Sequence, residues 1–374
     1  MKTASSMLIS SISELREVAS SWDDLWNRSS VAIPLARAEM VAQWVERFQA
    51  DGRFYAIVVE KDGRYLAALP LVETKKAKFI SAGANPSNAW SMCGQLLIDM
   101  NENSEEIMEE LIAAFRLLPF HILWLDYVRF DDAEWKLFRE VLAKKGIMSH
   151  WKSRYSTGIL VLDRPFDELS LRWKKKEICN IRRRIKKFFD PERTVFRFSD
   201  QTECVERLLP ECFELENRGW KGQQGSIILK NMEQFYLNQA RYLCENGMLR
   251  IYSLHLDEKL VAFQYALFSK SSLFSQKISY DPACRQMAPS QSLRYMEIEQ
   301  LSLEGRVTKM DFVGEMKDFH LCWNPQESIN GQIVLPLSSF VGKSFFFLYD
   351  TIMPWVRKRR EKRQLLQKEP NVAD

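Results

Sequence analysis

The sequence lacks the cysteine and histidine patterns of disulfide-stabilised or metal-binding proteins. Its 7 cysteines are scattered and include no Cys-x-x-Cys pair, which fits reduced thiols in a cytosolic chain better than a disulfide or zinc framework. The histidines are too dispersed to suggest a metal site; they are His121, His150, His255 and His320. We therefore expect no metal cofactor.

Long apolar runs and a large excess of one charge are also missing. No stretch is apolar enough to span a bilayer, and residues 1–18 lack the apolar core of a signal peptide. Lysine and arginine total 53 against 49 acidic residues, so the net charge of +4 is too small for a protein that binds nucleic acid as a whole. With 374 residues, 46% of them hydrophobic, we expect a soluble cytoplasmic protein of two lobes.

What is present is an alternation of helical and strand-like patterns. An amphipathic helix carrying Trp22 and Trp26 opens the chain, and residues 54–72 form a predicted hairpin because Asp62-Gly63 lies between two apolar alternations. The β-α-β rhythm of an α/β lobe then follows. Its segments are helix 104–118, strand 120–128, helix 131–146 and strand 156–163.

A second lobe is predicted to begin after Arg164-Pro165 with a basic helix over 166–189. A second hairpin over 249–269, turning at Asp257-Glu258, has the layout of the first. The two hairpins are either a weak internal duplication or unrelated meanders. The predicted organisation is a supporting lobe (1–164), a working lobe (165–343) and a basic C-terminal segment (344–374).

Only the second lobe continues from its hairpin through a small-residue corner into a clean helix. Residues 277–296 read KISYDPACRQMAPSQSLRYM, a strand followed by helical spacing from Ser290 onward. The first turn of a helix offers unpaired N–H donors and the positive end of the helix dipole. The corner therefore fits either a phosphate site or an ordinary strand-to-helix turn.

The order of hairpin, strand, corner, helix and strand in the second lobe resembles the acyl-CoA-binding core of the GNAT acetyltransferase superfamily. Three stretches, at 216–227, 279–293 and 311–324, look like its cellulose-biosynthesis-D-like branch. That branch is similar in build to the tandem-GNAT Fem peptidyltransferases, which use aminoacyl-tRNA. The resemblance implies an α/β fold of tandem GNAT-like lobes, each with a mixed central sheet flanked by helices.

The resemblance also implies that the corner holds the pyrophosphate of acyl-CoA, the expected co-substrate. The residues it assigns to this role are Arg285, Gln286, Ala288, Ser290 and Ser292. Here Ala288 carries a Cβ where the family has a glycine-like residue, and Pro289 contributes no N–H. Ser290 can still cap the helix.

Catalytic and substrate-binding candidates follow the neighbouring strand ends. The resemblance places Lys317 against an anionic substrate, and Asp311 or Glu315 is a candidate acceptor for the proton of an attacking amine. His320 is an alternative base or a packed helix residue, and Asp281 is catalytic or caps its turn. The candidates for holding the acceptor are Glu216, Trp220, Lys221 and Tyr280. The first three belong to a glycine-containing loop, and the alternative is that this loop is only a helix end with Gly219 as its C-cap.

Two basic stretches complete the pattern. The helix over 166–189 either presents a solvated face or receives the 3′-phosphate of coenzyme A, a tRNA acceptor stem or an anionic glycan precursor. The segment over 345–363 pairs aromatic with cationic residues, which suits an anionic membrane surface or a docked terminal helix.

The sequence therefore predicts an acyltransferase that moves an acyl group from acyl-CoA directly to an amine or hydroxyl of a small molecule or sugar intermediate, with surface-polysaccharide synthesis as the implied setting. No serine or cysteine has a base at useful spacing, so no covalent enzyme intermediate is expected. The alternatives are an aminoacyl-tRNA-dependent transferase, the one case with a nucleic-acid partner, and a non-catalytic assembly factor.

Overall fold

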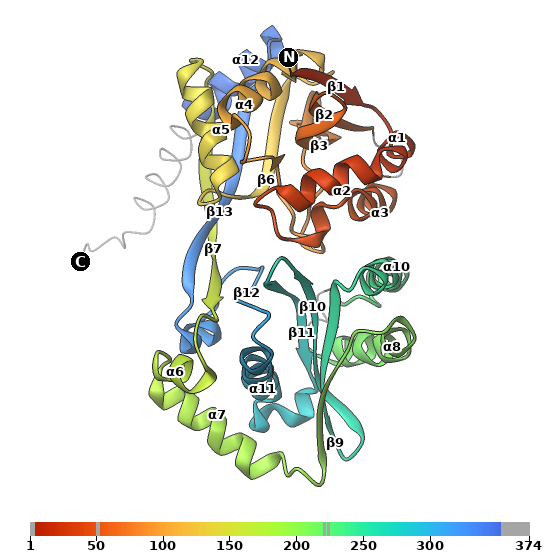
Figure 1. Cartoon of the computed structure of the whole chain (residues 1–374), viewed down its shortest axis with the longest axis vertical. Helices are drawn as coiled ribbons and strands as arrows, with labels where there is room; N and C mark the ends of the chain where they lie inside the picture. The colour runs from red at the N-terminus through yellow and green to blue at the C-terminus, as the bar shows by residue number, and fades with distance from the viewer. Residues whose placement is uncertain (1–3, 50–52, 220–221, 223–224, 353–374) are drawn as a thin grey trace, which may run out of the picture.

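One mixed sheet runs through the whole molecule (Figure 1). The computed structural model describes residues 4–49, 53–219, 222 and 225–352. The sheet has 13 strands in the order β1-β2-β3-β4-β6-β13-β7-β12-β11-β10-β9-β8, with β5 paired to β3. Its helices cover both faces, which confirms the predicted α/β class.

The first half of the sheet holds the strands that precede the predicted boundary. They are β1 (Ser5–Ile9), β2 (Phe54–Lys61), β3 (Arg64–Lys76), β4 (Ile80–Ala84), β5 (Leu97–Ile98), β6 (Ile122–Arg129) and β7 (His150–Val161). The helices are α1 (Ile12–Glu17), α2 (Ala19–Arg28), η1 (Pro34–Ala36), α3 (Ala38–Phe48), α4 (Ser104–Ala113), η2 (Ala114–Leu117) and α5 (Ala133–Lys144). The amphipathic opening was predicted as one helix, whereas a strand and two short helices are present.

The second half begins with helices and continues as a meander. Its helices are α6 (Phe166–Leu171), α7 (Lys175–Phe188), α8 (Thr202–Arg218), α10 (Glu233–Glu245), η3 (Pro282–Met287), α11 (Pro289–Glu304), η4 (Asp318–Trp323), α12 (Phe340–Phe347) and η5 (Leu348–Ile352). Its strands are β8 (Thr194–Ser199), β9 (Leu249–Leu256), β10 (Lys259–Ser269), β11 (Ser272–Tyr280), β12 (Lys309–Asp311) and β13 (Gln326–Pro336). No helix in these described ranges has the length and apolarity that crossing a membrane requires.

Both predicted hairpins are confirmed; the Asp62-Gly63 turn has the conformation that its sequence favours, whereas Glu258 adopts a positive φ that is uncommon for glutamate. Asp62 and Gly63 have φ of 52° and 78°, and Asp257 and Glu258 have φ of 49° and 63°. Positive φ at both central residues gives the turn the twist of the flanking strands. The local turn chemistry was therefore sufficient to locate these strands.

The predicted basic helix over 166–189 is wrong in one respect, because it is two helices. The helix is interrupted between α6 and α7. There the Trp173 side chain is buried and packs edge-on against Trp323, with ring centroids 5.0 Å apart. The Lys174 amide there donates to the Cys322 carbonyl at 3.0 Å. Burial of one large aromatic side chain thus outweighs the helical propensity of its neighbours.

Strand β13 joins the two halves of the sheet. It pairs antiparallel with β7 from Gln326↔Ile159 to Val334↔His150, and with β6 from Asn330↔Arg129 to Pro336↔Ile122. A strand from the end of the described chain is thus inserted between two strands from its first half. The domain boundary near Arg164-Pro165 stays a prediction.

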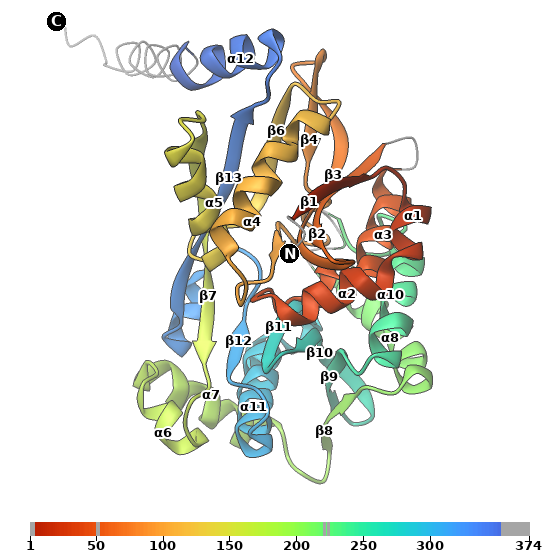
Figure 2. The same ribbon diagram turned by 45° about the horizontal axis from the view of Figure 1, so that its top comes forward.

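The helix layers continue from one half to the other. One buried cluster includes Trp22 of α2, Val41 of α3, Phe213 of α8 and Tyr236 of α10, so these four helices share a core on one side of the sheet (Figure 2). Helices α4 and α5 cover the opposite face of the first half. Helices α6, α7 and α11 cover the opposite face of the second half.

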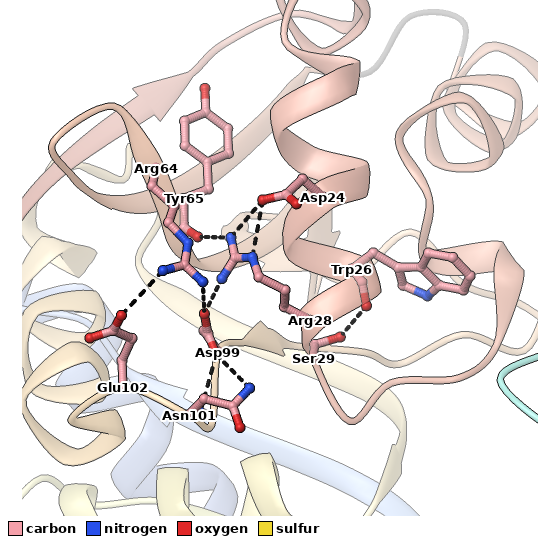
Figure 3. Close-up of polar contacts among 9 residues, drawn as sticks. All are labelled: Asp24, Trp26, Arg28, Ser29, Arg64, Tyr65, Asp99, Asn101 and Glu102. Atoms are coloured by element: carbon pink, nitrogen blue, oxygen red, sulfur yellow. Dashed lines mark hydrogen bonds and ion pairs between the residues drawn. The ribbon is translucent and has the colours of Figure 1, made fainter.

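The C-terminal end of α2 is fixed by buried ion pairs. Figure 3 shows Arg28 and Arg64 converging on the fully buried Asp99, which follows β5. Arg28 also donates to the Tyr65 carbonyl at 2.6 Å, and the Asn101 amide donates to Asp99 at 3.1 Å. These contacts hold the segment after α2, which forms one wall of the site below.

We expect Asp99→Ala to lower the free energy of unfolding by about 3 kcal/mol, because Arg28, only 17% exposed, would keep its charge without this partner. Urea unfolding followed by tryptophan fluorescence measures the loss. The control is Asp24→Ala, which removes a 58% exposed carboxylate from the same arginine and should cost less than about 1 kcal/mol. Equal losses in the two variants would contradict a dominant role for Asp99.

Candidate functional site

Strands β11 and β12 part soon after they meet. They pair in parallel only from Ser272↔Lys309 to Phe274↔Asp311, and β11 then continues to Tyr280 paired with β10 but no longer with β12. Beyond β12 the chain bonds to β7 instead, as the Phe312 amide donates to the Gly158 carbonyl at 2.9 Å. A register shift against β10 also leaves Gln276 as an extra residue in β11. The result is a V-shaped opening with backbone groups of β11 along one edge.

The predicted corner lies at the open end of this V. After η3, Ala288 has φ 49° and ψ 54°, and α11 begins at Pro289. Within the described chain the Ser290 N–H has no hydrogen-bond partner, whereas the Ser292 amide donates to the Ala288 carbonyl at 3.0 Å. Ser292 is fully buried, while Arg285 and Gln286 are exposed.

Asp281 caps the turn that leads into the corner. Its carboxylate accepts from the Ala283 amide at 3.0 Å and pairs with Lys259 at 3.2 Å. Burial raises the pKa of Asp281, but the Ala283 amide and Lys259 outweigh burial and leave this pKa below its ordinary value. The carboxylate is thus ionised and held by the backbone, which is the arrangement of a capping residue.

The three candidates after β12 are not among the residues that line the cavity described below with Asp311. Glu315 and Lys317 are exposed and pair with each other. His320 is buried, stacks on Phe312 with centroids 4.7 Å apart and accepts from the Lys317 amide at 3.1 Å. Burial, with Arg294 and Lys317 nearby, lowers the pKa of His320 to about 3. A neutral ring with that pKa is a weak proton acceptor.

The residues predicted to hold the acceptor have different environments in the structure. Glu216 is fully buried, accepts from the Ile227 amide at 2.9 Å and pairs with Lys277 at 3.4 Å. The Lys277 ammonium lies 4.5 Å from the ring centroid of Trp90, which comes from the first half of the chain. Tyr280 is half-buried at the end of β11, and Trp220 and Lys221 lie outside the described residues.

A cavity of about 330 Å³ lies between the two halves, at the closed end of the V. Its walls come from the segment after α2, the junction between β6 and α5, and the paired ends of β11 and β12. The residues that line it and carry the argument below are Ser30, Arg129, Asp132, Glu134, Asp311 and Asn330. Of the predicted catalytic residues, Asp311 lines this cavity.

Carboxylates in the cavity have unusual proton affinities. Asp311 pairs with Arg129, which reaches it from β6 in the other half of the molecule. Burial raises the pKa of Asp132 to about 6, with Arg129 opposing the shift and Asp311 adding to it. Burial and the neighbouring Asp132 raise the pKa of Glu134 to about 7. Glu134 accepts from the Ser30 hydroxyl at 2.9 Å, whereas the Asp132 carboxylate has no hydrogen bond or ion pair within the described chain.

Lys270 fixes the position of the segment after α2, which forms the cavity wall opposite these carboxylates. Its ammonium, on the turn between β10 and β11, donates to the carbonyls of Ser29 and Val31, each at 2.8 Å, and to that of Trp26. Burial lowers the pKa of Lys270 to about 8, while Glu134 opposes the shift. A side chain of the second half thus caps the end of α2 in the first half.

The sequence reasoning missed Arg129, Asp132 and Glu134. Asp132 and Glu134 stand at the N-terminus of α5, where acidic residues are common, so their pattern indicated only a helix start. A usable signal was present in the order of strand, arginine and three acidic residues at 129–134, which places charges where a strand ends.

Comparisons with known proteins bear on the fold. Residues 175–320 match the family described as acetyltransferase (GNAT) domain, and no curated protein matches the sequence. The fold is similar to that of FemX, with a TM-score of 0.62 and 14% identity over 92% of this chain and 99% of that one. It is also similar to the C-terminal domain of a putative lysylphosphatidylglycerol synthetase from Agrobacterium fabrum, with a TM-score of 0.53 and 10% identity over 89% and 97% of the two chains.

A third similar structure is a conserved protein of unknown function from Bacteroides thetaiotaomicron, with a TM-score of 0.53 and 11% identity over 87% of this chain and 98% of that one. At such identities the likeness concerns the fold alone. Residues 175–320 therefore match a GNAT domain, and the predicted mixed α/β fold, with a large central sheet flanked by helices, is confirmed. The cellulose-biosynthesis-D-like branch stays a prediction.

We expect Glu134→Gln to stabilise the protein at about pH 8, by about 2 kcal/mol, and to have no effect near pH 4.5. Because the folded pKa of about 7 exceeds the ordinary 4.5, the folded protein binds this proton more tightly than the unfolded chain, so its stability falls as pH rises between these values. Glutamine removes that loss and still accepts from Ser30. Urea unfolding across this pH range tests it, with the exposed Glu140→Gln on α5 as control; the same pH dependence in both variants would contradict it.

We expect Ala288→Gly to stabilise the fold by about 0.5–1 kcal/mol, because alanine pays a steric cost at φ 49° that glycine does not. Thermal unfolding measures the change. Ala283→Gly, within η3, is the matched control and should be destabilising. A loss of stability in both variants would show that the Ala288 backbone carries no strain.

Proposed function

We propose that the protein transfers an acyl group from acyl-CoA directly to an amine or hydroxyl acceptor bound in the cavity between its halves. The observation that carries the proposal is the position of the cavity, which lies at the closed end of the β11–β12 V while the α11 corner lies at its open end. A donor extended along the V would place its acyl group beside the acceptor. The second-half GNAT domain supports the reaction type.

The described residues suit the amide-containing part of acyl-CoA better than its pyrophosphate. Beyond Phe274, β11 is no longer paired with β12, and a ligand that carries amide groups suits such a strand because strands bind extended amide chains through backbone hydrogen bonds. The corner is less well equipped, because Pro289 has no N–H and the Ser290 N–H is the free amide of the first turn among the described residues. The exposed Arg285 adds a positive charge there. Acyl-CoA supplies the activated acyl group; the protein's own part is to orient and to move a proton.

Asp132 is the group best suited to take the proton of an attacking amine. A pKa of about 6 leaves its carboxylate ionised at neutral pH yet more basic than an ordinary aspartate. Asp311 is less suited because Arg129 occupies its carboxylate. The positive charge of Arg129 keeps the half-buried Asp132 carboxylate from being still more basic, whereas the charge of Asp311 acts in the opposite direction.

A second candidate donor, aminoacyl-tRNA, is favoured by the solvent face of α7. This helix packs beside η3 and α11, and none of its exposed cations pairs with an acidic side chain within the described residues. The cations are Lys175, Lys176, Arg182, Arg183, Arg184, Lys186 and Lys187. A face of this kind matches the phosphate backbone of a polyanion.

Two variants separate the donor half of the site from the cavity. Ser290→Glu should weaken acyl-CoA binding at least about tenfold through size and charge at the helix N-terminus. Asp132→Asn should leave that binding unchanged and lower the single-turnover rate by about 100-fold or more, because it removes the proton acceptor. Isothermal titration and rapid-quench kinetics measure the two effects.

The exposed Ser153→Glu on β7 controls for added charge, and thermal melts control for folding. Stabilisation by charged tRNA and not by any acyl-CoA would select the second donor. No stabilisation by either would indicate the non-catalytic alternative. Loss of acyl-CoA binding in Asp132→Asn would overturn the assignment of the cavity to the acceptor.

A further inference from the structure

Helix α12 is apolar on two faces and buries one of them. Phe346 and Gly342 face the sheet, and Gly342 is so close to the His121 carbonyl that a Cβ there would lie 1.9 Å from it. The other face carries Phe340, Val341, Phe347 and Leu348, which are 84%, 43%, 59% and 49% exposed. A helix that packs one face on the protein and exposes the other to water normally has polar residues on the exposed face.

Two more exposed apolar side chains lie at the same end of the sheet. Phe79, on the turn from β3 to β4, is 83% exposed, and Leu117, at the end of η2, is 41% exposed. Figure 2 shows this turn and α12 together at the top of the molecule.

Hydrogen bonds from His121 tie these segments together. Its amide donates to the Ser81 carbonyl at 2.9 Å, and its carbonyl accepts from the Leu337 amide at 2.9 Å. Its ring lies 3.1 Å from the Ser339 hydroxyl that caps α12. Phe79, Leu117, Phe340, Val341 and Phe347 are called the apical patch below.

Cations accompany the apical patch. Lys75 and Lys78 stand beside Phe79, Arg116 precedes Leu117 and Lys343 lies on α12, all exposed and without an acidic partner in the described part of the chain. The acidic groups at this end are engaged, since Glu73 accepts from the Ser81 hydroxyl at 3.2 Å and Asp350 pairs with His150. In the sequence, residues 357–363 follow as RKRREKR.

We propose that the apical patch inserts into the interface of an anionic phospholipid bilayer. Exposed phenylalanines flanked by lysines match an interface that is apolar below and negatively charged above. A second copy of the chain is a poorer occupant, because two copies meeting through this face would bring lysines and arginines of like sign together. The patch lies at the far end of the sheet from α11, so docking would leave the corner and its V open to a soluble donor (Figure 1).

The test is co-sedimentation of the full-length protein with vesicles of phosphatidylcholine alone or with about one third phosphatidylglycerol. We expect binding to the anionic vesicles, weakened by added salt. The double variant F79S/F340S should lower the partition coefficient at least about tenfold, and K75E/K78E should abolish the preference for phosphatidylglycerol. Both pairs are exposed, so both variants should keep the melting temperature of the parent.

The matched control is Leu171→Ser on α6, which removes an 84% exposed apolar side chain from the other half and should bind as the parent does. Parent-like binding by F79S/F340S would overturn the proposal. Loss of binding in R359E/R360E together with parent-like binding by F79S/F340S would assign the contact to residues 353–374 instead. A concentration-dependent dimer that F79S/F340S makes monomeric, without vesicle binding, would assign the face to a second copy.

Discussion

The hydrogen-bond ladder of β13 is the constraint on which the rest of the structure depends. Because β13 pairs with β6 on one edge and β7 on the other, the two halves of the molecule form one continuous sheet. The ends of β6, β11 and β12 are thereby held against one another, and the cavity exists because these ends do not close completely. Arg129 and Asp311, 182 positions apart in sequence, become an ion pair as a direct result.

The electrostatics of the cavity follow from crowding carboxylates in a place with little water. Burial favours the protonated forms of Asp132 and Glu134, and Arg129 limits this effect at both groups. The candidates outside the cavity differ for the same physical reasons. Glu315 and Lys317 are exposed and neutralise each other, and His320 is buried beside Arg294 without a carboxylate to stabilise its charged form. Proton affinity near neutrality is therefore found at Asp132 and Glu134 in the cavity and not at His320, the alternative base expected from the sequence.

Two segments have residues that are unusual for their local structure: the corner before α11 and the helix α12. At the corner, Ala288 adopts a left-handed conformation that glycine would adopt at lower cost, so the turn geometry is kept although the glycine is absent. At α12, aromatic side chains remain in solvent although the helix already packs its other face. The first departure bears on the proposed binding of acyl-CoA at the corner, and the second on the proposed contact with a bilayer.

Sequence alone determined the features that depend on neighbouring residues. Both hairpins, the corner and α11 were predictable because turn chemistry and helical periodicity act over a few positions. Asp311 was predictable as a polar residue at a strand end, but its partner Arg129 was not, since nothing local links β6 to β12. The same holds for β13, whose place between β6 and β7 is decided by pairing over long sequence separations. Only the tertiary structure could decide that the half-buried Asp132 and the buried Glu134, ordinary residues for a helix start, line one cavity, because loss of solvent there is what raises their pKa values.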